Sequence, residues 1–214
     1  MSDPLVIDVV SDVVCPWCFV GKRRLEAALK RDGEAQVRWR PFQLDAAIPP
    51  EGLDRQTYMR AKFGNGGRLA DAHARLKALG AEADIAFDFE AIHRSPNTFD
   101  AHRLIRFADE AGVADFVVER LFRDYFERGR DIGDREVLVE IAREAGLDPA
   151  LVRERLASPD GAEEVRREIE AAQRLGVSGV PYFIFASKFA LSGAQSEEVF
   201  AQALAKARKS QASA

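Results

Sequence analysis

Apolar and polar residues recur with two different periods along the chain, and these periods divide it into three parts. Near the N-terminus, a mostly apolar run at residues 5–10 and an alternating run at 36–44 predict two strands, and residues 16–31 carry apolar positions at helical spacing. A helix that joins two neighbouring strands is typical of a parallel βαβ unit with a right-handed crossover. Residues 1–48 are therefore predicted to begin an α/β fold.

Residues 49–175 show helical periodicity almost throughout, and Gly, Pro, Asp or Asn stands at each boundary. The predicted helices cover residues 54–63, 67–79, 97–111, 114–128, 135–145, 149–158 and 161–175. The run Asn65-Gly66-Gly67 is expected to be a flexible joint between two of them. This part of the chain is predicted to be a large all-α insertion.

Strand character returns in the last part, residues 176–214. Runs at 182–186 and 189–191, joined by Ser187 and Lys188, predict an antiparallel hairpin, and residues 196–207 predict a final helix. Residues 210–214 are expected to be frayed. The predicted order of elements is βαβ, a helical block and then ββα.

The chemistry of the chain is concentrated in Cys15-Pro16-Trp17-Cys18, which contains its only two cysteines. The pair lies where the first strand passes into the first helix, which is the layout of a redox dithiol. The positive end of the helix dipole favours a thiolate on Cys15 at the exposed helix start, and Cys18 lies one turn deeper. Cys15 is therefore the expected nucleophile and Cys18 the resolving thiol, while Pro16 suits the first helical position.

Two other uses of a CxxC pair are disfavoured. A structural zinc site needs four ligands, and beyond the cysteines only His73, His93 and His102 are available, so no metal site is expected. A purely structural disulfide across so short a loop would remove little entropy from the unfolded chain.

Composition and charge narrow the class of protein further. A chain of 214 residues that is 47% hydrophobic can bury a full core. A net charge of −4 with scattered Lys and Arg disfavours a nucleic-acid partner, and no apolar run approaches membrane-spanning length. The N-terminus lacks the basic and apolar stretches of a secretory signal, so a cytoplasmic protein is expected, where a lone CxxC is more often catalytic than structural.

These elements with the dithiol after the first strand predict an α/β, thioredoxin-like fold that carries the helical insertion. Several segments also carry a family resemblance: residues 11–22 around the CPWC run, Trp39-Arg40-Pro41-Phe42, Asn97-Thr98, residues 101–104, Gly176-Val177-Ser178-Gly179-Val180-Pro181 and residues 192–195. The chain resembles the FrnE-type branch of the DsbA family of thiol oxidoreductases, also described as polyketide-biosynthesis dithiol-disulfide isomerases. The resemblance spans almost the whole chain.

The resemblance implies that Val180-Pro181 is a cis-proline turn facing the dithiol. On the residues alone, a trans proline that begins an edge strand is the alternative. The resemblance also implies two roles for Pro181: it leaves the Val180 backbone free to pair with an extended substrate, and it prevents the two thiols from binding a metal.

Other residues give weaker signals. Asp8 is either a buried acid that assists proton transfer to Cys18 or a carboxylate at the rim of the sheet. In proteins with this insertion over the CxxC, Phe42, Asn97 and His102 would line the substrate groove, although Asn97 is also a natural helix N-cap. Trp17 is expected to be a partly exposed recognition surface. The basic residues that follow the dithiol are expected to form a solvated helix face, namely Lys22, Arg23 and Arg24.

The leading hypothesis is a thiol–disulfide oxidoreductase or isomerase acting on protein or small-molecule disulfides. It needs no cofactor beyond its own Cys15–Cys18 disulfide, with glutathione as a candidate co-substrate. One alternative is a glutathione-dependent transferase or isomerase, resembling the kappa-class transferases and 2-hydroxychromene-2-carboxylate isomerases, which typically have Ser in place of Cys15. Another is a non-catalytic, redox-switched binding protein.

Overall fold

A four-stranded mixed sheet organises the protein in the computed structural model, which describes residues 4–64 and 67–212. Its strands are β1 (Val6–Ser11), β2 (Gln36–Pro41), β5 (Tyr182–Phe185) and β6 (Phe189–Ser192), in the order β2-β1-β5-β6. Strand β2 pairs in parallel with β1, whereas β5 pairs antiparallel with both β1 and β6. This arrangement confirms the predicted α/β, thioredoxin-like core of a βαβ unit and a ββα unit.

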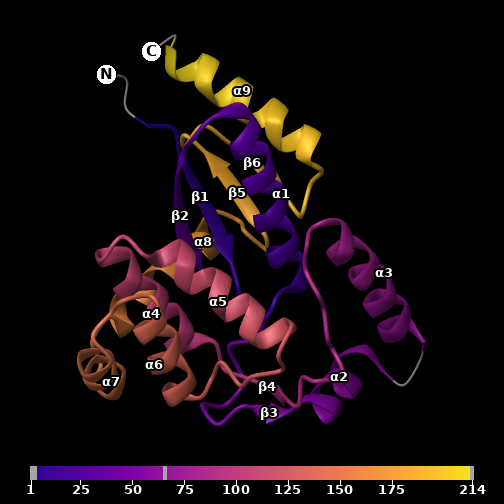
Figure 1. Cartoon of the computed structure of the whole chain (residues 1–214), viewed down its shortest axis with the longest axis vertical. Coiled ribbons are helices and arrows are strands. Elements are labelled where there is room, and N and C mark those ends of the chain that lie inside the picture. The colour runs from indigo at the N-terminus through magenta and orange to yellow at the C-terminus, as the bar shows by residue number, and fades with distance from the viewer. Residues whose placement is uncertain (1–3, 65–66, 213–214) are drawn as a thin grey trace.

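Alternation along β1 separates the two faces of the sheet. Ile7 and Val9 contribute to a core with α1 (Pro16–Asp32) and α9 (Glu197–Ala212). Val10 contributes to a smaller core on the other face, together with Ala172 of α8 (Ala162–Arg174). The sheet is therefore a central layer between helices, with α1 and α9 on one side and α8 on the other (Figure 1).

Besides α8, which covers one face of the sheet, the insertion contains two groups of helices. The first comprises α2 (Arg55–Phe63) and α3 (Arg68–Glu82), beside a two-stranded sheet of β3 (Leu53–Asp54) and β4 (Arg94–Ser95) that the sequence pattern did not predict. The second comprises α4 (Phe99–Glu110), α5 (Ala114–Phe126), α6 (Arg135–Glu144) and α7 (Pro149–Ala157). The two groups lie on opposite sides of the N-terminal end of α1, with α3 alongside that helix (Figure 1).

The helix that carries the cysteines belongs to two cores. Leu25 and Ala28 pack in the core under α9, but Phe19 and Val20 pack in the large core of the insertion. The ring of Phe19 stacks on that of Phe122 in α5 with 5.0 Å between centroids. The N-terminal turns of α1 are thus held by the insertion.

Lys22 is an exception to the expected solvated face of α1. It is buried at the contact with α5, where its ammonium group pairs with Glu26, with Glu119 at 3.1 Å and with Asp115 at 3.5 Å. Burial lowers the pKa of Lys22, but these three carboxylates outweigh burial, and the pKa is raised. The charge pattern alone could not distinguish this ion cluster from an exposed face.

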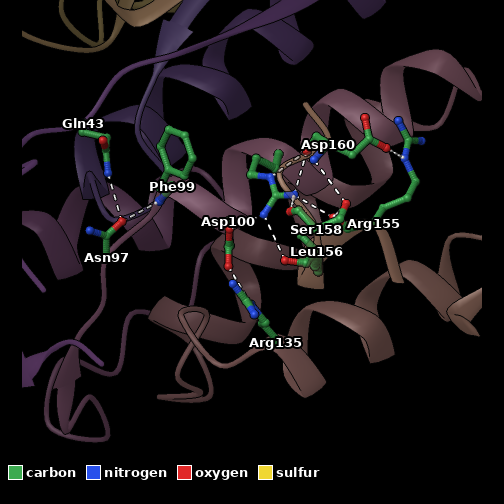
Figure 2. A network of polar contacts seen from close by, with 10 residues as sticks. Gln43, Asn97, Phe99, Asp100, Arg135, Arg155, Leu156, Ser158 and Asp160 are labelled. Atoms are coloured by element: carbon green, nitrogen blue, oxygen red, sulfur yellow. Dashed lines mark hydrogen bonds and ion pairs between the residues drawn. The ribbon is translucent and has the colours of Figure 1, made fainter. Parts of the chain in front are cut away.

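Arg103 ties three helices of the insertion together and is almost completely buried. Its guanidinium group donates to backbone carbonyls at the C-terminal end of α7 and in the loop that follows it, and to the Asp100 carboxylate in α4, which also pairs with Arg135 (Figure 2). The carbonyl acceptors belong to Arg155, Leu156, Ser158 and Asp160.

Two predicted details differ from the structure. The turn between β5 and β6 is centred on Ala186 and Ser187, both with positive φ, and Lys188 N donates to Phe185 O at 2.9 Å. This is the type I′ geometry that matches the twist of a two-stranded hairpin. Helix α9 continues to Ala212, so residues 210–212 are helical rather than frayed. Asn65 and Gly66 of the expected joint lie outside the described residues.

Candidate active site

The dithiol lies at the junction of β1 and α1. After β1 ends at Ser11, a turn closes with Cys15 N donating to Asp12 O at 3.0 Å, and Cys15 is the N-cap of α1 with Pro16 at its first turn. Cys18 N donates back to Cys15 O at 3.0 Å. Both cysteines are free thiols. The structure thus places Cys15 at the positive end of the helix, as predicted, and Cys18 inside the first turn.

The two thiols do not differ in exposure as expected, because both are buried, with 4% of Cys15 and 2% of Cys18 exposed. Cys18 is the deeper of the two. Burial raises its pKa well above the ordinary thiol value, and the neighbouring Cys15 raises it further, while the Ser11 hydroxyl and the Asp12 backbone lower it. The Cys18 thiol is therefore protonated in the reduced protein at neutral pH.

The Val180-Pro181 peptide bond is cis, which confirms the isomer implied by the family resemblance. The Cys15 thiol donates to the Val180 carbonyl, with 3.5 Å between sulfur and oxygen. Pro181 and Phe183 also approach the backbone of α1 closely at Gly21, where an added Cβ would lie 3.2 Å from Pro181 Cγ. The turn before β5 thus packs directly against the helix that carries the dithiol.

A cavity of about 350 Å³ opens beside Cys15. Its walls come from the start of α1, from Val180, and from apolar side chains of α2 and α3. Those helical side chains are Met59, Phe63, Leu69 and Leu76. Trp17 also lines it, half-buried, with the Arg75 guanidinium 5.9 Å from its ring centroid. Sequence reasoning missed this α2–α3 wall, although Met59 and Phe63 are four residues apart on one helix face and Leu69 and Leu76 are seven apart on another.

Phe42, Asn97 and His102 were expected in a groove over the dithiol, but none of them is among the residues that line this cavity. His102 is buried with its Nε2 atom 2.9 Å from the Phe42 carbonyl oxygen and 3.5 Å from Asp12 Oδ1. These contacts lie behind the turn that carries Cys15. Neither side chain faces the cavity, because Phe42 packs with Val10 and with Ala172 of α8, and His102 is buried in α4.

Asn97 has a local structural role. Its Oδ1 atom accepts hydrogen bonds from Phe99 N at 2.9 Å and from Gln43 Nε2 at 3.1 Å (Figure 2). Its amide nitrogen donates to Ile48 O at 2.6 Å. The N-cap position itself is Thr98, so Asn97 stabilises the start of α4 from one residue earlier and fastens it to the loop after β2.

Asp8 lies half-buried in the middle of the interior strand β1, between its partners in β2 and β5. Its Oδ1 atom accepts from Arg40 Nε at 2.7 Å, and Arg40 also approaches Glu168 of α8 at 3.5 Å. The groups that lower the pKa of Cys18 are the Ser11 hydroxyl, at the end of β1, and the Asp12 backbone, in the following turn. Asp8 points to the α8 face because it alternates with Ile7 and Val9 along the strand.

Two observations concern metals and membranes. Within residues 4–64 and 67–212, no cluster of three or more His, Cys, Asp or Glu side chains is placed to hold a metal ion. The same residues include no helix with the length and hydropathy needed to cross a membrane.

Comparisons with known proteins agree with this geometry. The model of the DSBA-like thioredoxin domain matches residues 6–205. The crystal structure of a probable DsbA oxidoreductase from Streptomyces coelicolor is 38% identical, with a TM-score of 0.87, and the match covers 96% of this chain and 90% of that one. The uncharacterised protein YwbO of Bacillus subtilis is 28% identical over 95% of this chain and 97% of its own. A cytosolic disulfide reductase, DsbM, from Pseudomonas aeruginosa, solved with GSH, shares the fold at 19% identity and a TM-score of 0.68, covering 95% and 99% of the two chains.

Proposed function

Because the chain belongs to the family of DsbA-like thioredoxin domains, we propose that Cys15 and Cys18 are the redox centre of a thiol–disulfide oxidoreductase or isomerase. The observation that carries the proposal is the asymmetry of the pair. Cys15 caps the helix beside an open cavity and the Val180 carbonyl, while Cys18 lies behind it with a raised pKa. This is the arrangement needed for one attacking thiol and one that acts later.

The reaction is two successive thiolate exchanges. The Cys15 thiolate attacks one sulfur of a substrate disulfide, forms a mixed disulfide and releases the other sulfur as a thiolate. Cys18 then loses its proton, attacks Cys15 and releases the second substrate thiol, leaving a Cys15–Cys18 disulfide. Two electrons pass from the protein to the substrate. A substrate that attacks its own mixed disulfide before Cys18 does is isomerised instead, with no net oxidation.

The raised pKa of Cys18 gives the mixed disulfide its lifetime. The Cys18 thiol remains protonated until it approaches the Cys15 sulfur, so attack on substrate precedes resolution. The Ser11 hydroxyl favours the Cys18 thiolate and is placed to assist that second step. Cys15, Trp17 and Val180 contact the substrate, and Pro181 fixes the position of Val180 against the thiol.

A monothiol must reduce the Cys15–Cys18 disulfide again if the protein works as a reductase, and we propose glutathione for this role. The fold shared with a disulfide reductase solved with GSH supports that choice, and the cytosolic setting of the same relative supports a cytoplasmic location. The presence of both Cys15 and Cys18 favours exchange over glutathione transfer or isomerisation of the kappa-class or 2-hydroxychromene-2-carboxylate isomerase kind.

The test compares single-cysteine variants of the full chain. With insulin or a mixed glutathione disulfide as substrate, Cys15→Ser is expected to abolish turnover, because the attacking sulfur is lost. Cys18→Ser is expected to accumulate a mixed disulfide on Cys15 that mass spectrometry detects. Equal activity of the Cys15→Ser variant and the wild type would refute the proposal, and so would the absence of any adduct on Cys15.

A further inference from the structure

We infer that the cavity beside Cys15 binds a small-molecule disulfide that carries an aromatic ring and an acidic group, with Arg55 as the residue that binds the acidic group. The inference rests on the proposed function, because it names the class of disulfide that reaches Cys15. It adds a specificity-determining residue on α2, outside the dithiol and the proline turn.

Access to the thiol favours a small molecule over a disulfide on a folded protein. Only 4% of Cys15 is exposed, and its thiol borders a cavity of about 350 Å³ between the start of α1 and the α2–α3 pair. This volume lies in the range of small-molecule sites. A disulfide on the surface of a folded protein would have to reach a thiol that is almost completely buried, whereas a molecule with one or two rings is small enough for the cavity itself.

The lining favours a ring next to the reacting sulfur. Aromatic side chains surround the cavity, including Trp17, Phe63, Phe89 and Tyr125. The His73 imidazole stacks on Phe89 with 4.1 Å between centroids, and burial, followed by the charge of Arg55, lowers the pKa of His73. His73 therefore adds a neutral ring to the wall. Offset and edge-on contacts with such rings stabilise an aromatic ligand more than an aliphatic one of the same area.

Two cations of α2 face the same cavity with most of their hydrogen-bonding capacity unused. Arg55 Nη1 donates to Tyr125 Oη at 2.9 Å, and Lys62 Nζ donates to Tyr58 Oη at 2.8 Å. Among the described residues, neither has a carboxylate within ion-pair distance. A guanidinium group has five N–H donors and binds a carboxylate in a fork geometry, so Arg55 is suited to an acidic ligand.

The acidic side chains that line the cavity are Asp45, near α2, and Asp12, in the turn before Cys15. Asp45 accepts from the Tyr58 hydroxyl at 3.0 Å and from Ala47 N at 3.1 Å. Asp12 is buried and accepts from Leu44 N at 2.8 Å through Oδ2, whereas its Oδ1 atom makes no hydrogen bond within the described residues. The groups left to meet a ligand at the α2 end are therefore positive.

The exchange needs no reagent beyond the reduced protein and the disulfide. The Cys15 thiolate attacks one sulfur of the aromatic disulfide, forming a Cys15–aryl mixed disulfide and releasing one aryl thiolate. The Cys18 thiolate then attacks Cys15 and releases the second aryl thiolate. Each protein molecule is oxidised by two electrons, both thiol protons go to solvent, and two coloured thiolates are released per dithiol.

The experiment measures single-turnover rates of the pre-reduced full chain with two chromogenic probes. Dithiobis(nitrobenzoate) has a carboxylate on each ring, and dithiodipyridine is an uncharged aromatic disulfide. We expect Arg55→Gln to lower the second-order rate with dithiobis(nitrobenzoate) on the order of tenfold, the loss of one charge-assisted hydrogen bond, and to change the dithiodipyridine rate less than twofold. Arg68 is an exposed residue at the start of α3 and does not line the cavity. Arg68→Gln removes the same charge and is expected to change neither rate.

The possible outcomes separate a failure of the Arg55 assignment or of the substrate class from a failure of the proposed function. If Arg55→Gln slows both probes equally, or slows neither, the assignment of Arg55 is wrong. If Arg68→Gln reproduces its effect, only the general charge of the protein matters and the assignment is also wrong. If the wild type reduces insulin disulfides faster than it reduces either aromatic probe, the substrate class is wrong while the proposed function stands. If the wild type forms no Cys15 adduct with any of the three, the proposed function itself fails.

Discussion

Gly21 offers a test of how closely the helix that carries the dithiol packs against the proline turn. A methyl group added there would lie 3.0 Å from Phe183 Cζ, 3.2 Å from Pro181 Cγ and 3.4 Å from Phe183 Cε2. The Phe183 ring is fully buried and packs edge-on against Phe200, with 4.8 Å between centroids, so it cannot move away freely. The Pro181 side is therefore expected to move by a few tenths of an ångström.

The magnitude follows from two opposed terms. Replacing Gly by Ala inside a helix stabilises it by about 1 kcal/mol. Overpacking a tight core costs about 1–3 kcal/mol. The net expectation for Gly21→Ala is a loss of about 1 kcal/mol, which lowers Tm by roughly 3 °C in a domain of this size.

The variant is also expected to react more slowly, because the turn that holds the Val180 carbonyl 3.5 Å from the Cys15 sulfur is displaced. The assay is thermal unfolding by circular dichroism together with the single-turnover rate of disulfide exchange. Gly67→Ala is a matched control, since an added Cβ there would meet no atom of the described residues within 4 Å. A higher Tm and an unchanged rate for Gly21→Ala would refute this account of the packing.

Two further predictions concern stability. Arg103→Met is expected to cost about 3 kcal/mol or more in urea unfolding, because several buried carbonyls lose their donor; a loss below about 1 kcal/mol would contradict this role. In the reduced protein, the folded state keeps a proton on Cys18 that the unfolded state releases above about pH 8.5, so the free energy of unfolding should fall as pH rises beyond that value. Cys18→Ala should flatten this dependence, and an equally steep profile in that variant would show that other groups cause it.

The sequence predicted the helices of the insertion well because their ends carry local signals. Asp148 before Pro149 and Asp134 before α6 accept hydrogen bonds from the first turn of their helices, as N-caps do. The dithiol and its helix were predictable for the same reason, since Cys15 and Cys18 are neighbours along the chain and Pro16 marks the helix start. Pro181 required the family resemblance, because its residues alone left the trans alternative open.

The cavity wall and the role of His102 could not be predicted, because they depend on how distant segments meet. Met59 and Leu76 line the cavity beside Cys15 only because α2 and α3 come together there in the folded protein, and neither residue carries a local signal of that arrangement. The contact between His102 and the Phe42 carbonyl also joins residues that are 60 positions apart, so no local signal predicts it. The burial of Lys22 was missed because its partner Glu119 is almost a hundred residues away in the chain.

The division of α1 between two cores affects what counts as a minimal unit of this protein. A shortened chain without residues 49–175 would keep the sheet and both cysteines, but it would uncover Phe19 on the same turn as Cys18 and remove Phe122, which stacks against it. It would also leave the Lys22 ammonium without Glu119 and Asp115. The insertion therefore helps to hold the two cysteines in position. A substitution at a buried position of α5 is expected to change the reactivity of the thiols.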